Sequence, residues 1–216
     1  RIREGKSLDD AVFSSGFESH SGFREAFARK FGAAPGRSRN AACVLLSWIR
    51  TPLGPLVAGA TTDGICLLEF SDRRMLETQL RTVSRLFGGH AAPGTNPHLV
   101  RLRAELIDYF AGTLRRFTVP LVYPGSDFQK RVWDALLRIP YGATRSYEGL
   151  AVAIGRPSAC RAVGHANGLN RIAIVIPCHR VIGKDGKLGG YGGGLRRKQF
   201  LLDLERAPAS PAARGR

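Results

Sequence analysis

The sequence predicts a protein of mixed α/β class, and three observations support this prediction. Short apolar runs bounded by turn residues predict strands in the first half of the chain. Capping patterns followed by apolar residues at helical spacing predict helices in both halves. One helix–turn–helix pattern is present at the start of the chain and another in its last third. A chain of 216 residues can hold one or two such domains and a small appendage.

The charge of the chain is strongly positive. Its 33 lysine and arginine residues exceed its 17 acidic residues and give a formal net charge of +16. A surplus of this size indicates a polyanionic partner, for which nucleic acid is the first choice. The alternative is a basic surface that serves solubility alone. No apolar run is long enough to span a membrane, so no membrane contact is predicted.

The cysteines and the first residues indicate the compartment. Cys43, Cys66, Cys160 and Cys178 are widely spaced, form no CxxC pair and match no zinc-binding spacing, so no metal site is expected. Free thiols are typical of a reducing compartment, and the first residues lack the apolar core of a signal peptide. A cytoplasmic location is therefore predicted. Because the chain does not begin with Met, we expect a fragment or a processed product.

The first block, residues 1–40, predicts two short helices separated by a glycine turn. Residues 7–10 form a capping box, and Gly16 ends the first helix. Three phenylalanines four residues apart form one face of the second helix: Phe23, Phe27 and Phe31. Gly32 and Pro35 end it. As geometry alone, this pattern fits a helical hairpin without DNA contact equally well.

The second block, residues 43–122, alternates strands and helices. Four strands and two helices are predicted, with strands at 43–49, 56–60, 65–70 and 117–121 and helices at 75–86 and 99–110. Residues 88–97 are predicted to be a loop. No compact cluster of polar residues is evident in this block, so the predicted role is that of a scaffold.

The third block, residues 124–206, opens with a capping box at 126–129. The helix that follows is predicted to bury one apolar stripe, which consists of Phe128, Val132, Trp133, Leu136 and Leu137. A last helix is predicted at 195–206, and the alanine-, proline- and arginine-rich residues 207–216 are expected to be a disordered tail.

A second helix–turn–helix lies inside this third block. Ser146 is predicted to cap a short helix through Ile154, and a turn leads to a second helix at 159–168. That second helix is rich in small residues: Ala159, Ala162, Gly164 and Ala166. Small residues permit close approach either to a nucleic-acid backbone or to a neighbouring helix, and the pattern does not distinguish the two.

The most informative residues surround Cys178. A β-branched run at 172–176 ends at Pro177, and the cysteine follows, beside His179 and Arg180. A strand that presents a thiol next to two potential cations predicts a reactive cysteine, because positive charge lowers a thiol pKa. The alternative is a buried, inert cysteine. The glycine-rich residues 183–194 permit close backbone approach to a ligand, but their spacing matches no nucleotide-binding loop, so no cofactor is expected.

Residues 176–181, Ile-Pro-Cys-His-Arg-Val, resemble the active-site signature of the O6-alkylguanine-DNA alkyltransferases, or methylated-DNA–protein-cysteine methyltransferases. Further matches lie at family spacing: Ser146-Tyr147, Leu150-Ala151, Arg161-Ala162-Val163-Gly164, Asn167, Asn170, Tyr191, Gly193-Gly194, Lys198, Leu201-Leu202 and Glu205. The similarity covers about residues 43–206. It implies a small ribonuclease-H-like α/β domain at 43–122 and a winged-helix-like helix–turn–helix alkyltransferase domain at 124–206.

The first 39 residues resemble the second half of an AraC-type DNA-binding domain. The matching residues are Gly16-Phe17, Ser19, Ser21, Phe23, Phe27, Phe31-Gly32 and Pro35. Val12 stands where that family usually places alanine. An AraC-type unit followed by an alkyltransferase is the order of the Ada-type regulators of the adaptive response. Their zinc domain and the first helix–turn–helix of their AraC-type unit are not in this sequence.

The resemblance to the alkyltransferases implies a single irreversible transfer. The alkyl group of O6-methylguanine or O4-methylthymine in double-stranded DNA would pass to Cys178 of a monomer that needs no cofactor. His179 would act as base and Glu205 would orient it, while Tyr147 would protonate the leaving guanine. Arg161 would fill the space left by the flipped nucleotide. The neighbouring small residues, Ala162 and Gly164, would contact the minor groove.

The resemblance also implies a pocket for the flipped base, formed by Asn170, Val181, Tyr191, Gly192 and Lys198. The carbonyls of Cys178 and Val181 and the Gly192 N–H would read the guanine edge. The family often has serine at the Gly192 position, so this chain lacks a hydroxyl there. Two other classes compete with this interpretation. One is a DNA-binding regulator or lesion sensor without transfer, and the other is a Cys-His hydrolase that turns over many equivalents of substrate.

Overall fold

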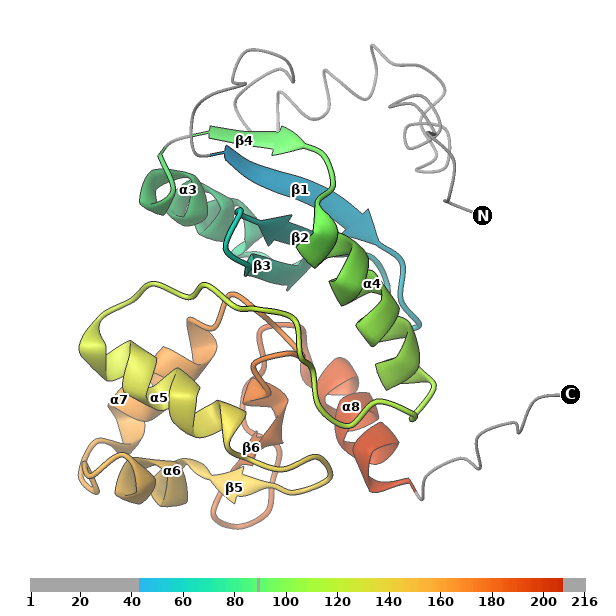
Figure 1. The fold of residues 1–216 in the computed structure, drawn as a ribbon. Coiled ribbons are helices and arrows are strands. Elements are labelled where there is room, and N and C mark those ends of the chain that lie inside the picture. Colours follow the sequence, from blue (N-terminus) through green and yellow to red (C-terminus); the bar gives the residue numbers. More distant parts are fainter. Residues whose placement is uncertain (1–42, 89, 208–216) are drawn as a thin grey trace, which may run out of the picture.

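The computed structural model describes residues 43–88 and 90–207. The helices predicted in residues 1–40, and the predicted tail beyond Ala207, lie outside the described residues. A four-stranded sheet fills the upper half of Figure 1, with strand order β3-β2-β1-β4. Its strands are β1 (Cys43–Ile49), β2 (Leu56–Ala60), β3 (Ile65–Phe70) and β4 (His90–Pro93).

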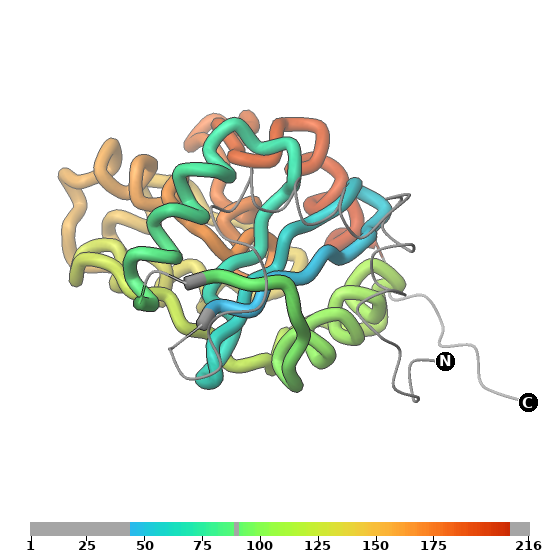
Figure 2. Tube along the Cα trace, turned by 90° about the horizontal axis from the view of Figure 1, so that it is seen from above, coloured from blue at the N-terminus to red at the C-terminus, as the bar shows by residue number. Residues whose placement is uncertain are grey.

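Both faces of this sheet are covered by helices. Helix α3 (Leu76–Leu86) packs on one face through a cluster that includes Leu76, Leu80 and Val83. Helix α4 (Pro97–Phe110) packs on the other face through Leu99, Leu102 and Leu106. The view from above in Figure 2 separates these two helices. Because both faces are covered, every residue of β2 and β3 is buried, and these strands are uniformly apolar except at Glu69.

The three strands predicted at 43–49, 56–60 and 65–70 are confirmed, whereas two other predictions for this half are wrong. The stretch 88–97 contains β4, which pairs in parallel with β1 and has none of the β-branched residues that mark a strand. The predicted strand at 117–121 is absent; this segment contributes only the bridge between Ile65 and Leu121. Pro120 has no N–H for a ladder, but its carbonyl accepts from the Ile65 N–H at 2.8 Å.

The second half of the chain is mainly helical and lies below the sheet in Figure 1. Its elements are α5 (Asp127–Leu137), β5 (Arg145–Ser146), α6 (Tyr147–Ala153), α7 (Cys160–Gly168), the 3₁₀ turn η1 (Cys178–Arg180), β6 (Val181–Ile182) and α8 (Leu195–Arg206). None of the helices in the described part of the chain is long and apolar enough to cross a membrane.

Capping explains where these helices begin. Ser126 and Gln129 form the predicted capping box of α5, and the Ser146 side chain accepts from the Gly149 N–H at the start of α6. Helix α4 begins two residues before the predicted start, because Asn96 caps it and Pro97 occupies its first position. The buried stripe of α5 is confirmed in part: Val132, Trp133 and Leu136 are buried, whereas Phe128 is only partly buried and Leu137 is exposed.

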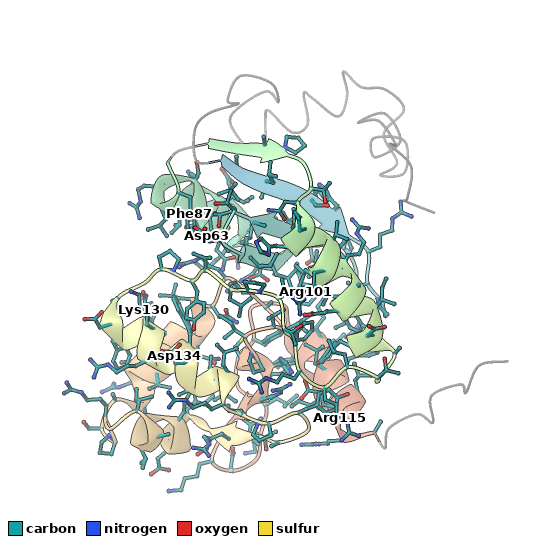
Figure 3. All side chains as sticks on the ribbon, in the orientation of Figure 1. Asp63, Phe87, Arg101, Arg115, Lys130 and Asp134 are labelled. Carbon is teal, nitrogen blue, oxygen red and sulfur yellow. The ribbon has the colours of Figure 1, made fainter. Side chains whose placement is uncertain are left out.

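The two halves share one apolar core. Side chains from the sheet, α4 and the second half fill the space between them (Figure 3). Backbone hydrogen bonds also cross this boundary: the Leu68 N–H donates to the Arg171 carbonyl at 2.8 Å, and the Ala173 N–H donates to the Leu68 carbonyl at 2.7 Å. The outer edge of β3 therefore holds residues 171–173, which lead directly to Cys178.

We predict that Leu136→Ala destabilises the protein by about 2–5 kcal/mol, because it leaves a cavity in this shared core. Leu137→Ala is the matched control: Leu136 has 0% exposure, whereas its neighbour Leu137 is 39% exposed. We expect the control to change the free energy of unfolding by less than about 0.5 kcal/mol. Urea denaturation followed by circular dichroism measures both. Equal losses in the two variants would contradict the burial that distinguishes these leucines.

Candidate active site

Cys178 lies at a pocket of about 250 Å³ that is built from both halves of the chain. Of the predicted site residues, six line this pocket: Tyr147, Gly164, Asn170, Cys178, Tyr191 and Gly192. The other predicted residues, His179, Glu205, Val181, Lys198, Arg161 and Ala162, do not line it. A pocket with a thiol and several converging polar groups has the composition of a ligand site.

Asn170 holds the segment that carries the thiol. Its Nδ2 donates to the Cys178 Sγ at 3.1 Å and to the Ile176 carbonyl at 2.9 Å, while its Oδ1 accepts from the Ile172 N–H at 2.9 Å. The predicted strand at 172–176 is therefore wrong. After the bridge at Ile172 the chain turns, and Ile174 adopts a φ of +70°, a strained conformation for a β-branched residue.

The pKa of the Cys178 thiol is higher than the adjacent residues His179 and Arg180 led us to expect. Burial raises its pKa to about 11, and the opposing effects of the Asn170 hydrogen bond and of the Arg73 and Lys198 charges do not overcome it. The prediction that the adjacent cations lower this pKa is wrong. Arg180 lies in the same 3₁₀ turn, but its guanidinium points to Glu205 and donates to that carboxylate.

The Glu205 carboxylate is a buried hub at the end of α8. It accepts five hydrogen bonds: from Tyr109 Oη at 2.7 Å, His179 Nε2 at 2.8 Å, Arg180 Nε at 2.8 Å, Arg180 Nη2 at 2.9 Å and the Gly142 N–H at 3.2 Å. Burial opposes ionisation, but the bonds from His179 and Arg180 outweigh it and lower the pKa of Glu205 to about 2. Glu205 is therefore ionised at neutral pH.

His179 is held as a neutral imidazole. It has 0% exposure, and burial lowers its pKa even though Glu205 favours the charged form. Because Glu205 is ionised, Nε2 carries the proton that Glu205 accepts, and Nδ1 keeps a lone pair. That Nδ1 is buried and has no hydrogen-bond partner among the described residues. The structure thus brings His179, the predicted base, next to Glu205, the carboxylate predicted to orient it. No direct hydrogen bond joins His179 to Cys178 within the described chain.

Lys198 and Tyr147 hold the glycine-rich loop against the pocket. Lys198 is buried in α8, and its Nζ donates to the Val181 carbonyl at 2.5 Å and to the Gly189 carbonyl at 3.2 Å. Burial lowers the pKa of Lys198. The Tyr147 hydroxyl donates to the Gly190 carbonyl at 3.5 Å, and burial raises its pKa. A Cβ at Gly189 would lie 2.9 Å from the Tyr147 ring, so a side chain at this position would displace Tyr147.

The second helix–turn–helix lies at the mouth of the pocket. Helix α7 contributes Gly164 and Asn167 to the lining, and both Arg161 and Ala162 are exposed near its start. The predicted helix at 159–168 is confirmed, beginning one residue later at Cys160. Exposed Arg161 is therefore available to a ligand that reaches the pocket across α7.

Glu69 and Arg73 line the pocket and were not predicted, because residues 43–122 were assigned a scaffold role. The two side chains form an ion pair, with 0% of Glu69 and 8% of Arg73 exposed, so residues 43–122 place polar groups at the pocket. Burial raises the pKa of Glu69, and the Arg73 charge and the Phe70 N–H oppose that rise. A signal existed, since Glu69 is the one charged residue in an apolar run and Arg73 follows four positions later.

Comparison with known proteins identifies the family. Residues 127–207 match the family model described as 6-O-methylguanine DNA methyltransferase, DNA binding domain. A methylated-DNA–protein-cysteine methyltransferase of Mycolicibacterium paratuberculosis is 53% identical over 150 residues, which cover 68% of this chain and 91% of that protein. The chain belongs to the methylated-DNA–protein-cysteine methyltransferase family.

More distant members of this methyltransferase family agree with the assignment. The methylated-DNA–protein-cysteine methyltransferase of Methanosarcina barkeri is 45% identical over 159 residues, covering 73% of this chain and 94% of that protein. The fold is also that of Mycobacterium tuberculosis OGT in its crystal structure with DNA. That match has a TM-score of 0.66 and 45% identity, and it covers 79% of this chain and 96% of the OGT chain.

We predict that iodoacetamide alkylates Cys178 of the free methyltransferase slowly at pH 7. Only the thiolate reacts, so with a pKa of about 11 the rate should rise about tenfold per pH unit from pH 7 to 10. Peptide mapping by mass spectrometry follows the site, and exposed Cys160 serves as the internal control for reagent access. A plateau below pH 8 would show that the thiol pKa is lowered instead.

Proposed function

We propose that this chain repairs DNA by direct reversal of alkylation. It transfers the alkyl group of O6-methylguanine, and of O4-methylthymine, in double-stranded DNA to the Sγ of Cys178, once per molecule. The observation that supports this proposal most directly is the position of Cys178 in a polar pocket of a chain that belongs to the methyltransferase family. The reaction needs a nucleophile, a base, an acid for the leaving group and a surface for DNA.

The nucleophile must lose its proton when the substrate is bound. The Nδ1 of neutral His179 is the acceptor available for that proton, and the family resemblance implies that a water carries it from Cys178. Glu205 stays ionised and stabilises the resulting imidazolium. His179 and Glu205 are thus positioning and proton-holding groups behind the thiol.

The thiolate then attacks the alkyl carbon. The Sγ–C bond forms, the C–O6 bond breaks, and its electron pair passes to the guanine, which gains one proton. Tyr147 lies at the pocket and supplies that proton as general acid. Gly192 and Cys178 line the pocket, and the Gly192 N–H and the Cys178 carbonyl bind the base edge. The family resemblance adds the carbonyl of Val181, a residue that does not itself line the pocket. The Val181 carbonyl already accepts from Lys198, and a carbonyl oxygen has a second lone pair for the base.

DNA binding is assigned to helices α6 and α7. The target base is stacked inside a duplex and must be extruded, which costs a few kcal/mol. Arg161 is exposed on α7 next to the pocket-lining part of this helix, so it is the residue that can occupy the vacated space. Exposed Ala162 and pocket-lining Gly164 let the helix approach the backbone closely. The net charge of +16 favours association with any duplex.

The finer organisation is also part of this proposal. Residues 43–122 form the ribonuclease-H-like domain, and residues 124–206 form the winged-helix-like catalytic domain. Residues 1–40 form the second half of an AraC-type unit, as in Ada-type regulators, and the protein acts as a monomer in the cytoplasm. The support for these points is the sequence resemblance described above and, for the location, the widely spaced free cysteines.

We predict that Cys178→Ala abolishes alkyl transfer and leaves DNA binding within about twofold, because only the nucleophile is lost. The measurement is intact-protein mass after incubation with a duplex that contains one O6-methylguanine, followed by peptide mapping. The unaltered chain should gain the mass of one methyl group, on Cys178, and no more with excess substrate. The control variant Cys160→Ala should show the same single mass gain. If the unaltered chain gains no mass but binds the lesion duplex more tightly than normal DNA, the protein is instead a lesion sensor.

We predict that Arg161→Ala slows repair of duplex DNA about tenfold or more and leaves the reaction with free O6-benzylguanine nearly unchanged. Only the duplex requires extrusion of the base. Arg81→Ala, which removes the same charge from exposed α3, is the matched control and should affect neither reaction. Single-turnover rates on both substrates test this. Equal losses on the two substrates would contradict a role for Arg161 in extrusion.

A further inference from the structure

The ion pair of Glu69 and Arg73 brings a buried cation to the pocket from the sheet, and the reaction described above does not use it. Glu69 lies in β3, and Arg73 follows in the turn before α3. Both residues line the pocket with Cys178, and the Arg73 charge acts on the Cys178 thiol. A buried guanidinium beside a nucleophile can act on the charges that change during the reaction.

Arg73 is held firmly in place. Its Nη1 pairs with Glu69 and donates to the Asn170 carbonyl at 3.3 Å, and its Nη2 donates to the Gly168 carbonyl at 2.7 Å. These bonds use three of the five guanidinium N–H groups. The Nε–H and one Nη2–H have no acceptor among the described residues. The guanidinium is thus oriented by its surroundings and retains two donors.

The two nitrogens that retain donors are the ones nearest Gly192. A Cβ at Gly192 would lie 2.6 Å from Nη2 and 2.7 Å from Nε of Arg73, closer than real contacts allow. Glycine is therefore required at position 192 while Arg73 occupies this place. The Arg73 guanidinium thus occupies the place that a Cβ at position 192 would take. Both Arg73 and Gly192 line the pocket that holds Cys178.

We propose that Arg73 is a further residue of the methyl-transfer reaction, which binds the O6 and N7 edge of the extruded purine through its Nε–H and free Nη2–H. Guanine presents two acceptors, O6 and N7, that match the arginine fork, and this is the commonest specific contact between arginine and guanine. This inference rests on the proposed function, because it concerns the base that function places in the pocket.

Such a contact strengthens during the reaction. When the C–O6 bond breaks, its electron pair passes to the guanine and negative charge develops on O6. A fixed cation next to O6 stabilises that charge more than the neutral ether oxygen of the substrate. The contact also favours a purine over O4-methylthymine, since a pyrimidine presents no N7. Arg73 thus supplies, from the sheet, side-chain hydrogen-bond donors to O6 that Gly192 cannot supply.

A substrate that lacks N7 tests this assignment. Single-turnover transfer is measured by the mass of methylated Cys178, with a duplex that carries O6-methylguanine and with its 7-deaza analogue. The unaltered chain should react about tenfold more slowly with the analogue, which loses one partner of the bidentate contact. In Arg73→Lys, which keeps the charge but not the fork, the two duplexes should react at rates within about twofold of each other.

Controls separate this role from a structural one. Arg73→Ala leaves Glu69 buried without its cation, so the variant E69Q/R73A is used to keep the protein folded. This variant should also treat both duplexes alike, whereas Arg74→Ala, which alters the exposed neighbouring arginine, should retain the tenfold difference. A purely structural Arg73 would leave the difference between the duplexes intact in every variant, and that result overturns the proposal. If the unaltered chain methylates Cys178 with neither duplex, the proposed function itself fails.

Discussion

The buried carboxylate of Glu205 is the interaction on which the position of the nucleophile depends. It receives donors from α4, from the turn before β5 and from two consecutive residues of η1. A buried carboxylate without such partners would be strongly destabilising. Because His179 and Arg180 are both bound to it, the 3₁₀ turn has one orientation, and Cys178 at the start of that turn faces the pocket. The same bonds hold the Arg180 guanidinium at Glu205 instead of at the Cys178 thiol. They also fix the tautomer of His179.

The pocket exists because the edge of the sheet meets the turn that carries the thiol. Backbone bonds between Leu68 and residues 171–173 bring β3 to this turn, and Asn170 then holds the turn by its own side chain. Arg73 reaches across from the sheet and donates to the Gly168 and Asn170 carbonyls. The first half of the chain therefore contributes polar groups to the site as well as support.

The environment of the thiol balances stability against reactivity. In the free protein, burial raises the pKa of the Cys178 thiol to about 11, which disfavours the reactive thiolate at neutral pH. The groups that can favour the thiolate, Arg73 and Lys198, are close enough to oppose the effect of burial, and His179 keeps a free lone pair behind the thiol. In the proposed reaction, the Cys178 thiol loses its proton when the substrate is bound.

Local sequence determined much of this protein. The three strands at 43–49, 56–60 and 65–70 and the caps at Ser126 and Ser146 follow from short-range patterns, which is why prediction and structure agree there. The signature around Cys178 likewise identified the nucleophile, since that motif is contiguous. Only the tertiary structure decided that β4 forms, that the thiol pKa is raised and that Arg73 joins the pocket. Each of these depends on burial and on partners distant in the sequence. The charge of Glu69 within an apolar run signals a polar partner nearby, but that local pattern does not place Arg73 at the pocket.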